Sequence, residues 1–220
     1  MNIPDSEKIS AYSHAATVPI MVIGTVILLV ISSGNTAAQI VSLVYGLSAI
    51  FLFSASFLYH SNKQKENDNS VWRKLDHSAI FFLIAGTYTP ICYIYLDGKM
   101  KWGILFAQWA LVLFGTVFKL IFINAPRLIG TLIYLLMGWI VLIPIATLFK
   151  TMEPTSLTLL VAGGISYTIG AVIYALKKPD PLPGFFGFHE IFHIFVTGGA
   201  ILHLLTIISG FKGYFLPTLF

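Results

Sequence analysis

The stretch FHEIFHIFVTGGAILHLLTIIS, residues 188–209, is a run of apolar residues with two histidines near its start. About 20 predominantly apolar residues are enough for a helix to cross the hydrocarbon core of a bilayer. On such a helix His189 and His193 lie on one face, about one turn apart, so both imidazoles can bind one cation. Ionisable groups inside a membrane segment are costly and point to a functional site. The stretch therefore predicts a membrane helix that carries part of a metal site.

The composition indicates a membrane protein. The 220 residues are 57% hydrophobic and only 10% charged, which is more apolar surface than a water-soluble domain of this size needs. The formal net charge is +4, but the basic residues are scattered over short loops and form no phosphate-binding face, so we expect no nucleic-acid partner. Cys92 is the single cysteine, which excludes an intramolecular disulfide and a thiolate zinc knuckle. A metal site must use His, Asp, Glu and water.

Polar breaks divide the chain into seven apolar segments. We therefore predict an all-α integral membrane protein, a seven-transmembrane-helix bundle forming a single domain over residues 1–220. The first apolar run begins near Ser10 without a small-x-small cleavage site, so we interpret it as a membrane helix and not as a removed signal peptide. Pro19 and Pro144 fall inside spans, where neighbouring helices tolerate kinks. The expected spans are 11–32, 37–60, 74–96, 102–122, 128–149, 156–176 and 188–209.

The basic residues predict the orientation. With the N-terminus inside, the inner segments hold nine of them: Lys8, Lys63, Lys65, Arg73, Lys74, Lys119, Arg127, Lys177 and Lys178. The outer segments hold four: Lys99, Lys101, Lys150 and Lys212. Cytoplasmic loops carry an excess of Lys and Arg, so this asymmetry favours a cytoplasmic N-terminus and a C-terminus outside.

The same topology brings histidines to one membrane face. Five of the six lie at the predicted cytoplasmic ends of their spans: His14, His60, His77, His189 and His193. Three imidazoles with an open fourth position form a catalytic zinc site, and we predict His60, His189 and His193 as the ligands of a Zn²⁺ ion. Asp76 is the expected carboxylate that takes a proton from the zinc-bound water or orients it. Ser56 lies four residues before His60 and is expected to hydrogen-bond that water.

Other polar residues near these ligands have competing interpretations. Glu190 completes an H-E-x-x-H pattern, in which it would be a protease base if it faced the metal water. His14 is expected, with Glu7 and Ser10, to cap the first span or to close the mouth of the site. His77 points about 100° away from Asp76 on an ideal helix and is expected at a helix interface. His203 is expected to be a buried, hydrogen-bonded histidine and not part of a second metal site.

Three separated motifs resemble a known family. Ser56-Phe57-Leu58-Tyr59-His60, then Asp76, then His189-x-x-x-His193 are similar to the pattern of the progestin and adiponectin receptor superfamily, and Glu7-x-x-Ser10-x-x-x-His14 resembles its N-terminal motif. The residues 188–193 are closest to the bacterial branch, the hemolysin III proteins. The resemblance implies seven helices, a cytoplasmic N-terminus and a zinc site held by His60, His189 and His193, with Ser56 and Asp76 beside the metal. Because the superfamily includes alkaline ceramidases, it also implies hydrolysis of lipid amides.

These observations give a function hypothesis with two alternatives. We expect a zinc-dependent hydrolase of lipid amide or ester bonds, a ceramidase-like amidase in the bacterial inner membrane, with membrane lipids as partners and a link to membrane homeostasis. The first alternative is a non-enzymatic sensor or receptor-like protein in which zinc is structural. The second is a membrane-lytic, pore-forming protein, as the hemolysin name implies. The sequence disfavours a self-inserting toxin because no soluble form, export signal or amphipathic switch segment is evident.

Overall fold

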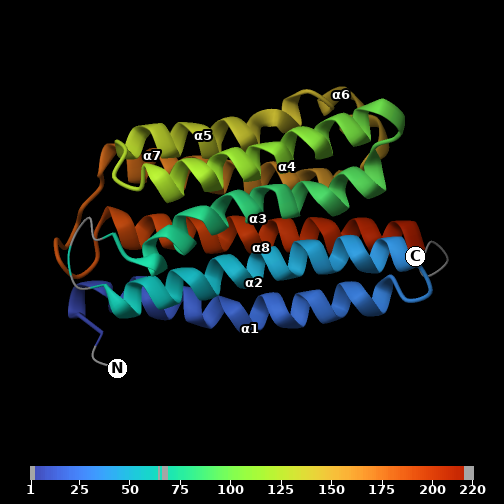
Figure 1. Ribbon diagram of the computed structural model, residues 1–220. Helices are drawn as coiled ribbons and strands as arrows, with labels where there is room; N and C mark the ends of the chain where they lie inside the picture. The colour runs from blue at the N-terminus through green and yellow to red at the C-terminus, as the bar shows by residue number, and fades with distance from the viewer. Residues whose placement is uncertain (1–2, 64, 66–68, 216–220) are drawn as a thin grey trace.

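The computed structural model describes residues 3–63, 65 and 69–215, and its regular elements there are helices (Figure 1). Six helices are long and apolar enough to cross a membrane, and the number rises to seven if one bent pair counts as a single span. The fold is therefore all-α and membrane-spanning, as predicted. In chain order the elements are η1 (Asp5–Glu7), α1 (Lys8–Ile31), α2 (Thr36–Asn62), α3 (Val71–Tyr95), α4 (Gly98–Ile121), α5 (Arg127–Trp139), η2 (Ile140–Leu142), α6 (Ile145–Thr151), α7 (Pro154–Leu176) and α8 (Phe188–Phe215).

Each predicted span coincides with a helix or with the bent pair, and local residues explain where several helices begin. The Asn35 side chain accepts from the backbone N–H of Ala38 at the start of α2, and Ser70 accepts from that of Arg73 at the start of α3. These are N-caps that satisfy free N–H groups in the first turn. Pro154 occupies the first position of α7, where a missing N–H costs nothing.

The fifth predicted span, 128–149, is broken. α5 passes into the short η2, and α6 continues after Pro144 at an angle of 54° to the first part. Proline has no N–H to bond the preceding turn, so the carbonyl of Ile140 loses its regular helix partner and accepts from the N–H of Ile143. Two side chains from neighbouring helices bond carbonyls just before the break: Tyr88 donates to the carbonyl of Gly138 at 2.6 Å, and Gln108 donates to that of Met137 at 2.9 Å. The kink expected at Pro144 is thus a full break held by α3 and α4.

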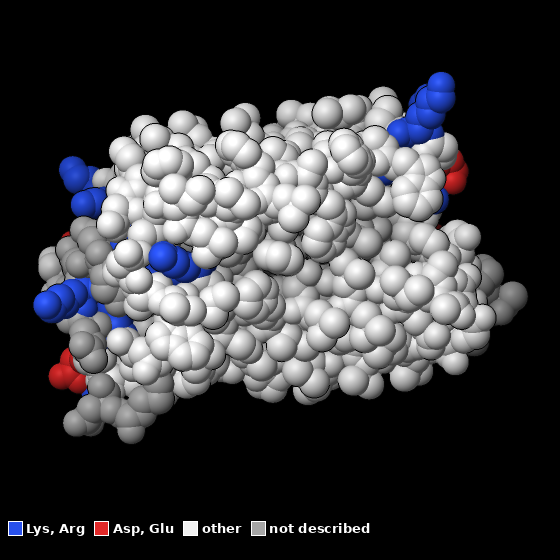
Figure 2. Space-filling model, viewed as in Figure 1, with Lys and Arg blue, Asp and Glu red and all other residues white. Residues whose placement is uncertain are grey.

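The helices run roughly parallel to one long axis, with α8 beside α1, α3 and α7 (Figure 1). The first described residues and the end of α8 lie at opposite ends of the bundle, as an odd number of crossings requires. Charged residues gather toward the two ends, and a broad uncharged band lies between them (Figure 2). Large apolar side chains of the helices are exposed, for example Val30, Phe106, Leu113 and Leu136. Such a surface fits contact with lipid chains.

Candidate metal centre

Three imidazoles meet at one end of the bundle. His60 lies in the last turn of α2, and His189 and His193 lie in the first two turns of α8. The Nε2 atoms of His60 and His189 are 3.4 Å apart, and those of His189 and His193 are 3.2 Å apart. One ligand atom from each of the three residues lies within 4.8 Å of the other two. The structure therefore brings together the three histidines that the sequence singles out, two of them almost fully buried.

Their spacing suits a single cation. Nitrogen ligands bound at 2.0–2.1 Å in a tetrahedral arrangement lie about 3.3 Å from one another. The Nε2 separations of 3.2 and 3.4 Å are close to that edge length. A neutral imidazole carries only one N–H, so three facing nitrogens cannot all be satisfied by donating to each other. A bound cation uses all three lone pairs at once.

A carboxylate holds the first of these rings. Oε2 of Glu7 lies 2.6 Å from Nδ1 of His60, and the other oxygen, Oε1, accepts from Nζ of Lys63 at 2.6 Å. With the proton on Nδ1, His60 presents its Nε2 lone pair to the shared space. Metal-ligating histidines commonly donate their second nitrogen to a carboxylate, which fixes the tautomer and the ring orientation. Glu7 thus belongs to the candidate metal centre, although it lies 53 residues before His60.

This role differs from the cap that the sequence suggests for Glu7. Glu7 occupies the position before α1, but its side chain caps no N–H there. Ser10 does not cap either, because its hydroxyl donates to Glu190 at 3.0 Å. The E-x-x-S-x-x-x-H pattern was visible in the sequence, but the partner of each member lies on another helix. The capping interpretation is therefore wrong for Glu7 and Ser10.

His14 packs against the centre. Its ring stacks on that of His193 with centroids 4.0 Å apart, and it meets the Phe53 ring edge-on at 4.9 Å. Neither of its ring nitrogens has a hydrogen-bond partner among the described residues. His14 therefore packs against His193 at the contact between α1 and α8.

Asp76 and Ser56 form a second polar group. The Ser56 hydroxyl lies near the Asp76 carboxyl. Ser56 is buried on α2, one turn before His60, and Asp76 lies near the start of α3. Tyr174 of α7 packs against His189 with ring centroids 5.7 Å apart. Because Ser56 and His60 lie four residues apart on α2, the pair Ser56–Asp76 lies about one turn from the histidine group.

The remaining predicted residues have structural partners. Both oxygens of Glu190 are engaged, one by Ser10 and the other by the backbone N–H of Gly187 at 2.8 Å. Nδ1 of His77 lies 2.8 Å from the carbonyl of Arg73. His203 bonds the carbonyl of Leu160 at 3.2 Å, as expected for a hydrogen-bonded histidine, but its side chain is only partly buried.

Sequence comparisons place these residues in a family. The haemolysin-III related family matches residues 4–204, which include all of the histidines described above. This chain belongs to the haemolysin-III related family. Hemolysin-3 of Bacillus cereus is 35% identical over 96% of this chain and 93% of its own length. The hemolysin-3 homolog of Bacillus subtilis (strain 168) is 35% identical over 88% of this chain and 89% of its own. The adiponectin receptor protein of Drosophila melanogaster is 30% identical over 77% of this chain and 42% of its own.

Proposed function

We propose that this haemolysin-III related protein is a zinc-dependent hydrolase of membrane lipids, which cleaves amide or ester bonds. The observation that carries the proposal is the group of three imidazoles, in which Nε2 of His189 lies 3.4 Å from that of His60 and 3.2 Å from that of His193, with His60 oriented by Glu7. The group is largely buried within a bundle that spans the membrane. Its substrate would therefore reach it from the bilayer.

The donor set supports zinc in particular. Three imidazoles without a thiolate are typical of catalytic zinc centres, in which a water or substrate atom occupies the fourth position. Zinc, when bound, supplies a Lewis acid that lowers the pKa of a coordinated water to about 7. His60, His189 and His193 would hold it, and Glu7 would keep Nε2 of His60 directed at it.

Two residues beside the histidines would then act in the hydrolysis. Asp76 would accept a proton from the attacking water, and Ser56 would hold the carboxylate in position by a hydrogen bond. The water oxygen forms a bond to the carbonyl carbon while the C–N or C–O bond breaks. The proton taken by Asp76 passes to the leaving amine or alcohol, and a fatty acid is the other product. This assignment leaves no catalytic task for Glu190, whose oxygens are already engaged.

The proposed location is the bacterial inner membrane, with the metal centre near the cytoplasmic face. The excess of Lys and Arg at the histidine end of the bundle supports this orientation. A link to membrane homeostasis would follow from turnover of lipids in the protein's own membrane.

A receptor-like function with structural zinc has one observation in its favour. Contacts at the metal centre connect the N-terminal segment to α2 and α8: Glu7 bonds His60 and Lys63, and His60 faces His189. A metal there would act as a clamp between helices. A clamp requires the metal but not a proton acceptor, and this separates the two functions experimentally.

The test is product analysis by mass spectrometry. Purified protein is incubated with total membrane lipid, with and without a chelator, beside Asp76→Asn and His60→Ala variants. We expect free fatty acid only from metal-loaded wild type, and loss of hydrolysis in Asp76→Asn with its zinc retained. Absence of any zinc-dependent product from every lipid class would refute the hydrolase proposal and favour the clamp.

A further inference from the structure

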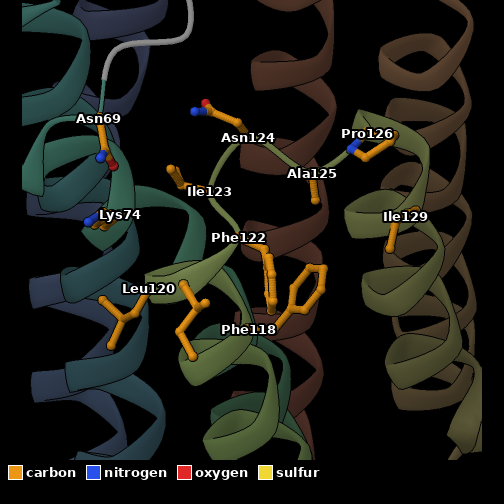
Figure 3. A pocket seen from close by; sticks show the side chains of 11 residues that line it. Asn69, Lys74, Phe118, Leu120, Phe122, Ile123, Asn124, Ala125, Pro126 and Ile129 are labelled. Atoms are coloured by element: carbon orange, nitrogen blue, oxygen red, sulfur yellow. The ribbon is translucent and has the colours of Figure 1, made fainter.

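A groove lies on the α3, α4 and α5 side of the bundle, away from the α2–α8 contact that holds the histidines. It has a volume of about 540 Å³ and lies between the start of α3, the end of α4 and the loop that leads into α5. In Figure 3, Asn69, Lys74 and Asn124 stand at one end of the groove, and the apolar side chains of α4 stand at the other. The groove is thus divided into a polar head and an apolar wall.

The apolar wall continues along the membrane-facing surface of α4. Phe118 and Phe122 line the groove, with ring centroids 5.6 Å apart. Phe114, one turn farther along α4, stacks on Phe118 at 6.4 Å. Both Phe114 and Phe122 are more than half exposed, at 61% and 55%. This row of rings offers an acyl chain an apolar track from the groove toward the middle of the bilayer.

The polar end is positively charged. Lys74 lines it, and no acidic side chain lies within ion-pair distance of Lys74 in the ranges that the structure describes. Asn124 also lines it and accepts from Nη1 of Arg73 at 2.8 Å. An amide that is oriented by a buried guanidinium directs its own NH₂ away from that contact. The end therefore offers an ammonium group and an amide donor to an anion.

A buried lysine lies directly behind the wall. Lys119 is only 3% exposed, and its ammonium lies 5.8 Å from the Phe118 ring and 5.9 Å from the Tyr134 ring. Among the described residues no carboxylate pairs with it, and it interacts with the like charge of Arg73. Cations removed from water need compensating charge. An anion in the groove would supply it for Lys74, which lines the groove, and would add negative charge to this region of two lysines.

We propose that this groove binds one phospholipid with an anionic headgroup. Its phosphate would be held by Lys74 and Asn124, and one acyl chain would lie along Phe122, Phe118 and Phe114. Basic pockets between membrane helices at the cytoplasmic side are suited to anionic lipid headgroups. Anionic lipids are enriched in the cytoplasmic leaflet, which the positively charged loops face. The site is built from residues outside the metal centre, so it does not depend on the proposed hydrolase function.

The experiment compares lipids at equal chain length. Wild-type protein in nanodiscs of dioleoyl phosphatidylcholine is titrated with dioleoyl phosphatidylglycerol, and bound lipid is counted by native mass spectrometry after release. We expect phosphatidylglycerol to be retained in preference to phosphatidylcholine. Lys74→Gln should weaken this retention about fivefold, the effect of one lysine at a lipid headgroup. The matched control is Lys178→Gln, an exposed lysine at the same end of the bundle, which should change it less than about twofold.

Further arms separate the alternatives. Phe122→Ala should weaken the retention of phosphatidylglycerol without altering zinc content, because the ring lies in the groove and not at the histidines. Equal retention of both lipids, or equal effects of Lys74→Gln and Lys178→Gln, would overturn the proposal. Displacement of the lipid by millimolar inorganic phosphate would also overturn it, since the groove would then be a plain anion site.

Discussion

Glu7 lies directly before α1, and its carboxylate contacts both the His60 ring and the Lys63 ammonium. Its two oxygens have separate partners at 2.6 Å, so neither contact can be replaced by the other. A side chain from outside the long helices thus controls which nitrogen of His60 is free. We therefore expect a substitution of Glu7 to change the affinity for the metal more than the free energy of unfolding.

Glu7→Gln tests this control. The amide cannot accept a charge-assisted bond from His60 in the same way, so we expect zinc affinity to fall by about 10–100-fold. Competition with a chelator of known affinity measures it. The matched control is Asp5→Asn in the same η1 turn, where the carboxylate is exposed and pairs only with Lys8. Unchanged zinc affinity in Glu7→Gln would show that the contact does not tune the metal.

Glu190→Gln addresses the protease interpretation of the H-E-x-x-H pattern. Because the Glu190 oxygens accept from Ser10 and from Gly187 N–H, we expect a modest loss of stability, about 1 kcal/mol, with zinc content unchanged. Thermal unfolding in detergent and elemental analysis measure the two effects. Complete loss of lipid hydrolysis in a folded, zinc-loaded variant would contradict our assignment and give Glu190 a catalytic role.

At the scale of the elements, close helix packing depends on small residues at particular positions. A Cβ at Gly115 of α4 would lie 2.5 Å from ring atoms of Phe81, a fully buried side chain of α3. A Cβ at Gly103 of the same helix would meet nothing within 4 Å. Small residues let membrane helices approach, so only the first of these glycines is required for packing.

Alanine at the two positions should have opposite effects. Gly115→Ala is expected to destabilise the protein by about 1–3 kcal/mol, because the buried ring has little room to move. Gly103→Ala should be neutral or stabilising by up to about 1 kcal/mol, because alanine favours the helix. Thermal unfolding in one detergent compares them. Equal destabilisation by both would mean that the α3–α4 contact is not set by Gly115.

The break between α5 and α6 is an element-scale feature with its own test. Tyr88→Phe and Gln108→Leu each remove a donor to a carbonyl just before the break, so each should cost about 1–2 kcal/mol. Hydrogen exchange over residues 137–145 should become faster in both. Tyr12→Phe, at an exposed ring, is the control. Unaltered exchange in both variants would show that the broken span does not need these donors.

At the scale of the whole molecule, the predicted orientation can be tested with single cysteines. In a Cys92→Ser background, Lys178→Cys and Lys212→Cys place thiols at exposed positions near opposite ends of the bundle. With a cytoplasmic N-terminus, a membrane-impermeant maleimide added to intact cells should label only Lys212→Cys. Labelling of Lys178→Cys alone would reverse the topology and put the metal centre outside.

The sequence was sufficient to predict the helical spans and the group of three histidines. The length of an apolar run and the i, i+4 spacing of two histidines are local signals. It predicted that His60, His189 and His193 share one end of the bundle, and they are found together. It could not predict that Glu7 pairs with His60, or that Tyr88 and Gln108 stabilise a broken span. Those contacts join residues up to 53 positions apart, and only the packing of the helices brings them together.

The central claim is that these three histidines hold one zinc ion. Elemental analysis of purified, folded protein tests it most directly, with His60→Ala and His193→Ala beside wild type. The control is His203→Ala, which removes a partly buried histidine that bonds the Leu160 carbonyl. We predict about one zinc per chain in wild type and in His203→Ala, and almost none in the other two variants. A folded wild type without zinc, or full zinc in His60→Ala, would contradict the account.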